Sequence, residues 1–162
     1  MERNWNKDWR KSVIVLSGGF DPVHRGHLRM LRESSWLGHQ VVVGLNSDEW
    51  LKRKKGKPFM KFNERKEILE GFKYVNQVLP FDDSDNTACN LIKRVRTIYG
   101  GDRFNYDYLD TNPTGETEYK LYFANGGDRT TDNVPEKSVC EELDVTMLWG
   151  VGGGKIQSSS WL

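Results

Sequence analysis

The sequence contains little cysteine and no long hydrophobic run. Its two cysteines, Cys89 and Cys140, fit neither a zinc-site spacing nor a disulfide framework, which is typical of ordinary thiols in a reducing compartment. No apolar segment approaches the ~20 residues that a membrane-spanning helix needs. The first ten residues, MERNWNKDWR, lack an apolar h-region, so we expect no signal peptide. These absences favour a cytoplasmic protein that has no membrane partner.

The chain also lacks a large net charge of either sign. The 24 Lys and Arg residues exceed the 23 Asp and Glu residues by one, which argues against binding to nucleic acid or membrane surfaces through bulk charge. A length of 162 residues, with 16 glycines and 12% aromatic residues, suits one folded domain. We therefore predict a single domain over residues 1–162, with its core in 13–162.

Short β-branched runs alternate with segments of helical periodicity along the chain. Strands are predicted over residues 13–16, 41–45, 75–79, 121–123 and 145–148. Helices are predicted over 28–36 closed by Gly38, 64–72 with Asn63 as N-cap, 86–98 from Asn86, and 135–143 with Pro135 in the first turn. This alternation predicts an α/β fold, a Rossmann-like three-layer sandwich with a mainly parallel five-stranded sheet. The polar segment 103–118 breaks the pattern and is predicted to be an inserted loop or hairpin.

Ligands of such sheets bind beyond the carboxyl ends of the strands. Glycine and polar residues follow four of the predicted strands, at 18–21, 46–48, 126–129 and 152–155. The first of these segments leads to His24 and His27, with Gly26 between them, at the start of a predicted helix. A helix N-terminus attracts phosphate, imidazoles donate to phosphate oxygens, and a glycine admits the ligand close to the backbone. A pair of ordinary surface histidines is the alternative, and a metal pair lacks a third ligand at a suitable spacing.

The surrounding residues GGFDPVHRGHLRML resemble the HxGH signature of the cytidylyltransferase-like nucleotidyltransferase superfamily. The resemblance runs from Val13 to Leu162, apart from the inserted segment. It implies that His24 and His27 are catalytic and contact the α-phosphate of a nucleoside triphosphate. It also implies that the residues before them bind the nucleotide, together with the intervening glycine: Gly18, Gly19, Phe20, Asp21 and Gly26.

A basic run, Lys52 to Lys57, follows Asn46-Ser47-Asp48-Glu49. Such a run is usually a solvated surface. Here its layout is similar to that of glycerol-phosphate cytidylyltransferases and of the adenylyltransferase domain of ADP-heptose synthases. In these families a lysine of this loop helps to bind phosphate. The resemblance implies this role for Lys52 and Lys55, with Lys57 as a further candidate.

Two glycine-rich segments complete the resemblance. Gly127 and Asp128, with Arg129, match a segment that lies under the ribose and base in the related families; a similar Gly100–Arg103 follows a helix and is discounted. Gly152 to Lys155 is not a P-loop, because Trp149 and Ile156 stand where that motif needs Gly and Ser or Thr. The segment instead resembles the second signature of the superfamily, with nucleotide contacts from Gln157, Ser158, Ser159 and Ser160. Gln157 stands where the family usually has isoleucine.

These features predict a nucleotidyltransferase that transfers a nucleotidyl group, with CMP favoured, from a nucleoside triphosphate to a polyol or sugar phosphate and releases pyrophosphate. Mg²⁺ is expected to accompany CTP or ATP, with no separate metal site. One alternative is adenylyl transfer from ATP to a heptose phosphate or a nicotinate or nicotinamide mononucleotide. The other is a non-catalytic nucleotide-binding protein. The resemblance also implies a homodimer, and Trp50 and Phe59 are candidates for its contact, whereas Trp36 is predicted to be in the core.

Overall fold

The computed structural model describes residues 11–100, 119–126 and 134–153. Within these ranges five strands form one sheet in the order β3-β2-β1-β4-β5, and every neighbouring pair is parallel. The strands are β1 (Lys11–Gly18), β2 (Gln40–Leu45), β3 (Gln77–Pro80), β4 (Tyr119–Gly126) and β5 (Val145–Val151). The prediction of an α/β fold with a five-stranded parallel sheet is therefore confirmed.

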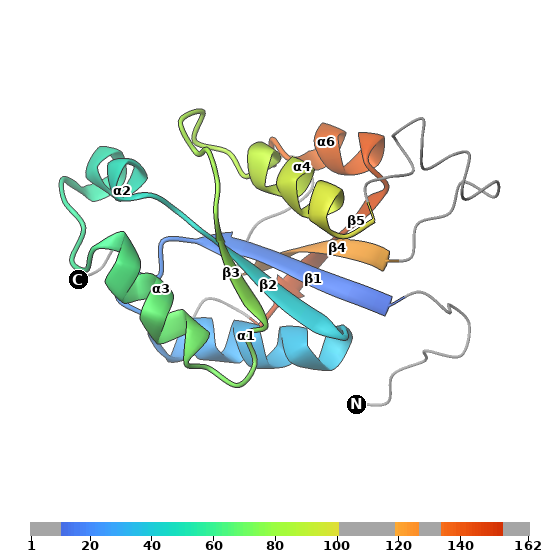
Figure 1. Ribbon diagram of the computed structural model, residues 1–162, viewed down its shortest axis with the longest axis horizontal. Helices are drawn as coiled ribbons and strands as arrows, with labels where there is room; N and C mark the ends of the chain where they lie inside the picture. The colour runs from blue at the N-terminus through green and yellow to red at the C-terminus, as the bar shows by residue number, and fades with distance from the viewer. Residues whose placement is uncertain (1–10, 101–118, 127–133, 154–162) are drawn as a thin grey trace.

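Helices cover both faces of the sheet, as Figure 1 shows. On one face lie α1 (Arg25–Leu37) and α3 (Phe62–Glu70), and on the other α4 (Cys89–Ile98) and α6 (Lys137–Glu142). Alternate residues of β1 serve the two layers, because successive side chains of a strand point to opposite faces. On one face, Ile14 and Leu16 pack with Leu31 of α1 and Leu69 of α3. On the other face, Val13 packs in a cluster that includes Leu91 of α4.

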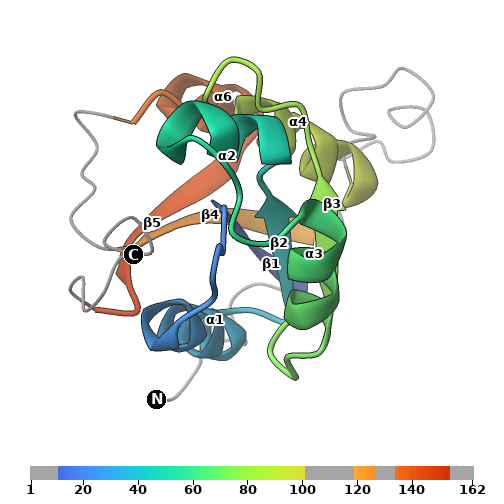
Figure 2. The ribbon, with the colours of Figure 1, turned by 90° about the vertical axis from the view of Figure 1, so that its left-hand side faces the viewer.

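The chain order creates a switch point beside β1. The chain passes from β1 outward to β2 and β3, then returns to the other side of β1 with β4 and β5. Strands β1 and β4 are therefore neighbours whose following connections run in opposite directions, which is where open α/β sheets bind their ligands. Figure 2 looks onto the carboxyl ends of the strands, with α1 and α2 (Asp48–Lys55) on opposite sides.

The basic run was predicted to be a loop, and this is wrong. Residues 48–55 form α2, with Ser47 as N-cap, Asp48 and Glu49 in the first turn and four cations in the last. This charge distribution complements the helix dipole. The helix escaped prediction because Leu51 is its one buried residue, so there is almost no apolar periodicity to detect.

Several predicted boundaries are also wrong. Helix α3 has Lys61 rather than Asn63 as N-cap, because Phe62 already packs against the core. Asn86 has a left-handed φ of 62° and belongs to a turn, so α4 begins at Cys89. Val75 precedes β3 and donates to the carbonyl of Phe72. Pro135 comes before Glu136, which is the N-cap of α6.

Trp36 is more exposed than predicted, whereas Phe59 is exposed, as its prediction as a dimer contact requires. Trp36 is 42% exposed, with the Arg32 guanidinium 5.8 Å from the centre of its ring, so its prediction as a core residue is wrong. Phe59 is 74% exposed. Across the described ranges, no helix has the length and apolar character that crossing a bilayer requires. The predicted insertion at 103–118 lies outside the described residues.

Candidate active site

The loop from β1 to α1 contains Gly18, Gly19, Phe20 and Asp21, the first predicted nucleotide contacts. Phe20 has a left-handed backbone, with φ 49°, which a bulky side chain rarely adopts. Its ring is buried and lies 4.7 Å from the ring of His27, centre to centre. Burial of this ring stabilises the loop conformation and gives His27 an apolar neighbour.

The two histidines are fixed by the start of α1. His24 is the N-cap, and its Nδ1 accepts a hydrogen bond from the Gly26 N–H at 3.1 Å. The N–H of His24 donates to Nδ1 of His27 at 3.2 Å, and the two rings stack at 3.9 Å. A ring nitrogen that accepts a hydrogen bond carries no proton, so the proton of each neutral ring is on Nε2. Both histidines are therefore Nε2–H donors.

Burial keeps both rings neutral near pH 7. It lowers the pKa of His24. Burial, and after it the charges of His24 and Lys54, lowers the pKa of His27 to about 3. Nε2 of His24 is buried and has no hydrogen-bond partner among the described residues. A buried donor without an acceptor costs ~1–3 kcal/mol, which a ligand oxygen at this place would offset.

Helix α2 is anchored at the carboxyl end of β2 by Asp83, which is buried. The Asp83 carboxylate accepts from the N–H and hydroxyl of Ser47, both at 2.7 Å, and from Nδ2 of Asn46 at 3.0 Å. The hydroxyl of Ser47 in turn accepts from the N–H of Trp50 at 3.1 Å. This chain of bonds fixes where the cations of α2 lie.

The lysines of α2 have different surroundings. Lys52 pairs with Glu49 at 3.1 Å, and both side chains are more than half exposed. Lys55 pairs with the Asp21 carboxylate at 2.8 Å. Lys54 lies over the Trp50 ring, 4.7 Å from its centre, and its charge contributes to the lowered pKa of His27. Lys54 was not selected from the sequence.

Asp21 serves as an anchor between segments. Its side chain is 1% exposed and accepts from the N–H groups of Phe59 and Met60, each at 2.6 Å. Burial alone would raise the pKa of Asp21, but the Lys55 hydrogen bond and the two backbone N–H groups outweigh it and hold the pKa below its ordinary value. Its carboxylate therefore joins the glycine loop to the α2–α3 connection. A cavity of about 290 Å³ lies beside this contact, between Pro22 and Phe59.

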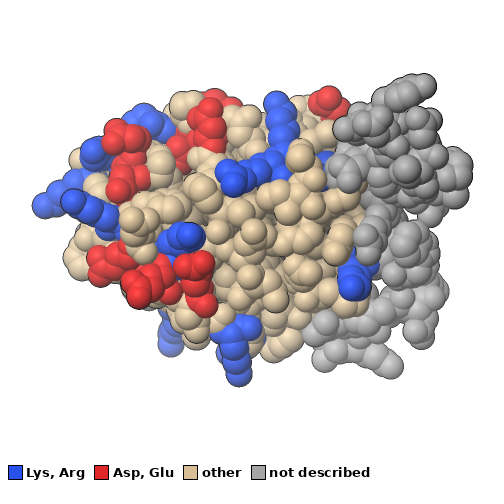
Figure 3. Space-filling view, in the orientation of Figure 1, with Lys and Arg blue, Asp and Glu red and all other residues tan. Residues whose placement is uncertain are grey.

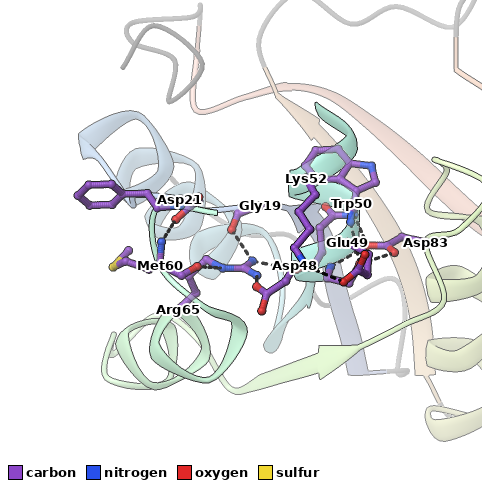
Figure 4. Close-up of polar contacts among 12 residues, drawn as sticks. Gly19, Asp21, Asp48, Glu49, Trp50, Lys52, Met60, Arg65 and Asp83 are labelled. Atoms are coloured by element: carbon purple, nitrogen blue, oxygen red, sulfur yellow. Dashed lines mark hydrogen bonds and ion pairs between the residues drawn. The ribbon is translucent and has the colours of Figure 1, made fainter. Parts of the chain in front are cut away.

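Arg65 of α3 is a second anchor, and sequence reasoning assigned it no role. Its fully buried guanidinium donates to the carbonyls of Gly19, Asn46 and Met60 at 2.8–2.9 Å and pairs with Asp48 at 2.6 Å. Figure 4 shows it between the glycine loop and the start of α2. Only the local sequence Asn63-Glu64-Arg65 could have pointed to this role. Spacing along the chain does not distinguish a buried arginine from an exposed one.

The other side of β1 is formed by the ends of β4 and β5, which approach α1 closely. A Cβ on Gly126 would lie 2.8 Å from Sδ of Met30, and one on Gly152 would lie 3.1 Å from the Met30 backbone. Gly152 also has a left-handed φ of 85°. Both the close approach to Met30 and this backbone conformation therefore require glycine at this position. The predicted contacts Gly127, Asp128, Arg129, Gln157, Ser158, Ser159 and Ser160 lie outside the described residues.

The described residues do not fit a resident metal ion. They contain no group of three or more His, Cys, Asp or Glu side chains that could hold one. The carboxylates of Asp21 and Asp48 are paired with Lys55 and Arg65, and the Nδ1 atoms of both histidines accept backbone N–H bonds. Any Mg²⁺ would therefore come with the triphosphate, which can supply most of its oxygen ligands together with water.

Charges on the surface are mixed rather than segregated. On the face drawn in Figure 3, Lys and Arg side chains are interspersed with Asp and Glu at the end of the molecule where α2 and α3 lie. No continuous basic patch forms on this face. Residues of the basic run make local contacts instead. Arg53, for example, donates to the carbonyl of Asp83 and to Oδ1 of Asn86.

A parallel Rossmann-like sheet with a histidine pair at the start of its first helix is the architecture of a nucleotidyltransferase. The chain belongs to the cytidylyltransferase-like family, whose model matches residues 15–151. The predicted family and the fold expected from it are thereby confirmed, whereas the second signature, Gln157 to Ser160, lies outside the matched residues.

Curated relatives match the chain over part of their length. Bifunctional protein HldE of Geobacter sulfurreducens is 36% identical over 140 residues, covering 78% of this chain and 27% of that protein. Bifunctional protein HldE of Campylobacter concisus is 36% identical over 98 residues, covering 59% of this chain and 20% of that protein. The chain thus spans about a fifth to a quarter of the length of these relatives.

Solved structures share the fold at low identity. A lipopolysaccharide core biosynthesis protein from Thermoplasma volcanium superposes with a TM-score of 0.56 at 18% identity, over 86% of this chain and 94% of that one. A putative nicotinate-nucleotide adenylyltransferase from Vibrio parahaemolyticus gives a TM-score of 0.53 at 16% identity, over 93% and 84%. These likenesses support the fold alone.

Proposed function

We propose that the protein transfers a nucleotidyl group from a nucleoside triphosphate to a small phosphorylated acceptor and releases pyrophosphate. The observation that carries this proposal is the buried Nε2 of His24, a donor without a partner among the described residues, beside the switch point. An anionic oxygen is the group that such a donor at a helix N-terminus attracts. Membership of the cytidylyltransferase-like family supports the same activity.

The reaction needs no nucleophile from the enzyme. An oxygen of the acceptor phosphate attacks the α-phosphorus, a new P–O bond forms, and the bond to the pyrophosphate oxygen breaks. Negative charge rises on the α-phosphate oxygens as this happens, and preorganised donors aimed at them lower the barrier. His24 and His27 are assigned to these oxygens as neutral donors.

Positive charge must then come from elsewhere, because both imidazoles are neutral near pH 7. Lys54, which lies over the Trp50 ring in the last turn of α2, is added as a candidate phosphate ligand. Lys55 keeps a supporting role through its pair with Asp21, and the Lys52 assignment stays a prediction. Gly18, Gly19, Phe20 and Gly26 shape the phosphate loop. Gly127, Asp128, Arg129, Gln157 and Ser158 to Ser160 stay predicted nucleotide contacts.

The nucleotide and the acceptor are tested together. Pyrophosphate release is measured with CTP and with ATP against phosphorylated polyols, sugars and mononucleotides. CTP with a polyol or sugar phosphate is the pair expected from the signatures, whereas the matches to HldE proteins favour the adenylyl alternative, which uses ATP. Nucleotide binding without pyrophosphate release from any pair would instead support the non-catalytic alternative.

The homodimer and the cytoplasmic location stay predictions. Phe59 and Trp36 are 74% and 42% exposed, and exposed aromatic side chains are often buried by a partner surface. Light scattering should give about twice the 18.8 kDa chain mass. A mass near that of one chain, with and without nucleotide, would contradict the dimer.

A further inference from the structure

The side chain of Asn125 is buried at the carboxyl end of β4 with an acceptor unused. The residue is 3% exposed, and its Nδ2 donates to the carbonyl of Leu148 at 3.3 Å. A carbonyl only accepts, so this bond settles which end of the amide is the nitrogen. Oδ1 therefore points the other way, where it is buried and has no hydrogen-bond partner among the described residues.

An unused buried acceptor makes the fold less stable than an apolar side chain of the same shape would. Asn76 shows the ordinary arrangement in this protein, since its Oδ1 accepts from the N–H of Val41 at 2.8 Å. The difference between the two asparagines indicates that Oδ1 of Asn125 is available to a group that the described residues do not supply.

The position of Asn125 is at the switch point. Strand β4 pairs with β1 up to Val15 and Phe123, and Asn125 lies two residues beyond that pair. The loop to the histidines leaves β1 at the same edge. The unused donor of His24 lies in the segment after β1, and the unused acceptor of Asn125 lies at the carboxyl end of β4. One unsatisfied polar atom is therefore found at the end of each of these neighbouring strands.

The chemistry of the two atoms is opposite. Nε2 of His24 donates and suits an anionic oxygen, whereas the Asn125 oxygen repels an ionised phosphate and requires an O–H or N–H group. A nucleoside triphosphate has both, with anionic oxygens at one end and hydroxyl and amino groups at the other. We propose that Oδ1 of Asn125 accepts a hydrogen bond from a hydroxyl or amino group of the nucleoside part of the substrate. This inference rests on the proposed function and names a residue that determines its nucleotide specificity.

The test combines variants of the residue with analogues of the ligand. Affinities of wild type and of Asn125→Leu are measured by calorimetry for CTP and ATP, for their 2′-deoxy and 3′-deoxy forms, and for UTP and ITP, which lack the amino group. Asn125→Val is carried in parallel because it is smaller and fits where leucine would overpack. Asn76→Leu is the matched control, because its amide oxygen is already bonded within the chain.

Wild type should lose affinity about 3- to 10-fold for the one analogue that lacks the contacted group. In Asn125→Leu the parent nucleotide should bind that much more weakly, and the analogue penalty should disappear. The melting temperature of ligand-free Asn125→Leu should stay at or above that of wild type, whereas Asn76→Leu should melt lower without a change in nucleotide affinity.

The outcomes separate the two proposals. If wild type binds no nucleotide, the proposed function fails and this inference fails with it. If nucleotides bind but every analogue penalty persists in both Asn125 variants, the inference alone is overturned. A ligand-free melting temperature that falls in Asn125→Leu and Asn125→Val as much as in the control would also overturn it, because the amide would then be a structural one.

Discussion

The two edges of the sheet, where the strands begin and where they end, each contain a buried arginine, yet only the edge formed by the carboxyl ends adjoins the switch point. At the carboxyl edge Arg65 holds three carbonyls and Asp48. At the amino edge Arg96 donates to the carbonyls of Tyr99 and Tyr119 at 2.9 and 3.0 Å and to those of Leu143 and Asp144 at 3.4 Å. Both side chains gather loop carbonyls that the ends of elements leave without partners.

Histidines mark the same contrast. His39 lies at the amino edge, with Nδ1 at 3.0 Å from both the N–H and the hydroxyl of Ser12. At the carboxyl edge the buried Nε2 of His24 and Oδ1 of Asn125 have no partner among the described residues. Rigid support is thus common to both edges, and the unsatisfied atoms of His24 and Asn125 lie at the edge at which we propose that substrate binds.

The largest expected effect concerns the histidines. His27→Ala should lower turnover about 10²–10³-fold, the usual cost of deleting one preorganised donor to the transition state. Nucleotide affinity should change much less. His39→Ala is the control from the opposite edge and should stay within about threefold of wild type. Steady-state kinetics give the turnover of both variants. Near-normal turnover of His27→Ala would contradict the functional difference between the two edges.

The buried arginines are expected to separate stability from activity. Arg65→Met and Arg96→Met should each unfold more readily, by about 3–5 kcal/mol for the variant that leaves Asp48 unpaired. At low temperature, where both variants are folded, kcat/KM should fall at least about tenfold in Arg65→Met alone, because loops that position the site would shift. Urea titrations and kinetics at 10 °C test this, and equal activity losses would mean that the edges are equivalent.

Lys54→Ala should raise the KM for the nucleoside triphosphate about tenfold, the expected loss for one charged hydrogen-bond donor. Lys93→Ala is the matched control, because Lys93 is exposed on α4, away from α2. Initial rates over a nucleotide series give both values. An unchanged KM in Lys54→Ala would return the assignment to Lys52 or Lys55.

The last expected effect is one of pH on stability rather than on activity. The pKa of His27 is lowered to about 3 in the folded protein, so the unfolded chain binds a proton that the folded chain does not. Stability from this group is therefore complete above about pH 6.5 and is lost as the pH falls from there towards 3. His27→Gln should flatten this part of the unfolding curve, and His39→Gln serves as the comparison. An equal slope in wild type and His27→Gln would contradict the neutral, buried ring.

Sequence patterns revealed the parts of this protein that local chemistry determines. The strands alternate with helices in the expected order, and His24 and His27 lie at the predicted helix start. The contacts of Asp21 and Arg65 could not be predicted in the same way, because most of them join residues 17 to 46 positions apart. The α2 lysines show the limit best, since Lys52 pairs with Glu49, Lys54 lies over the Trp50 ring and Lys55 pairs with Asp21.

The cap of α1 has an entropic consequence. Because the Nδ1 atoms of His24 and His27 are bonded to the backbone, both imidazoles lose their rotational freedom when the helix forms, and folding bears that loss. A substrate phosphate then meets donors that are already immobile, and none of its binding free energy is consumed in ordering them. Replacing His24 by asparagine would keep the helix capped while removing the imidazole donor. The variant would therefore keep its fold and lose turnover.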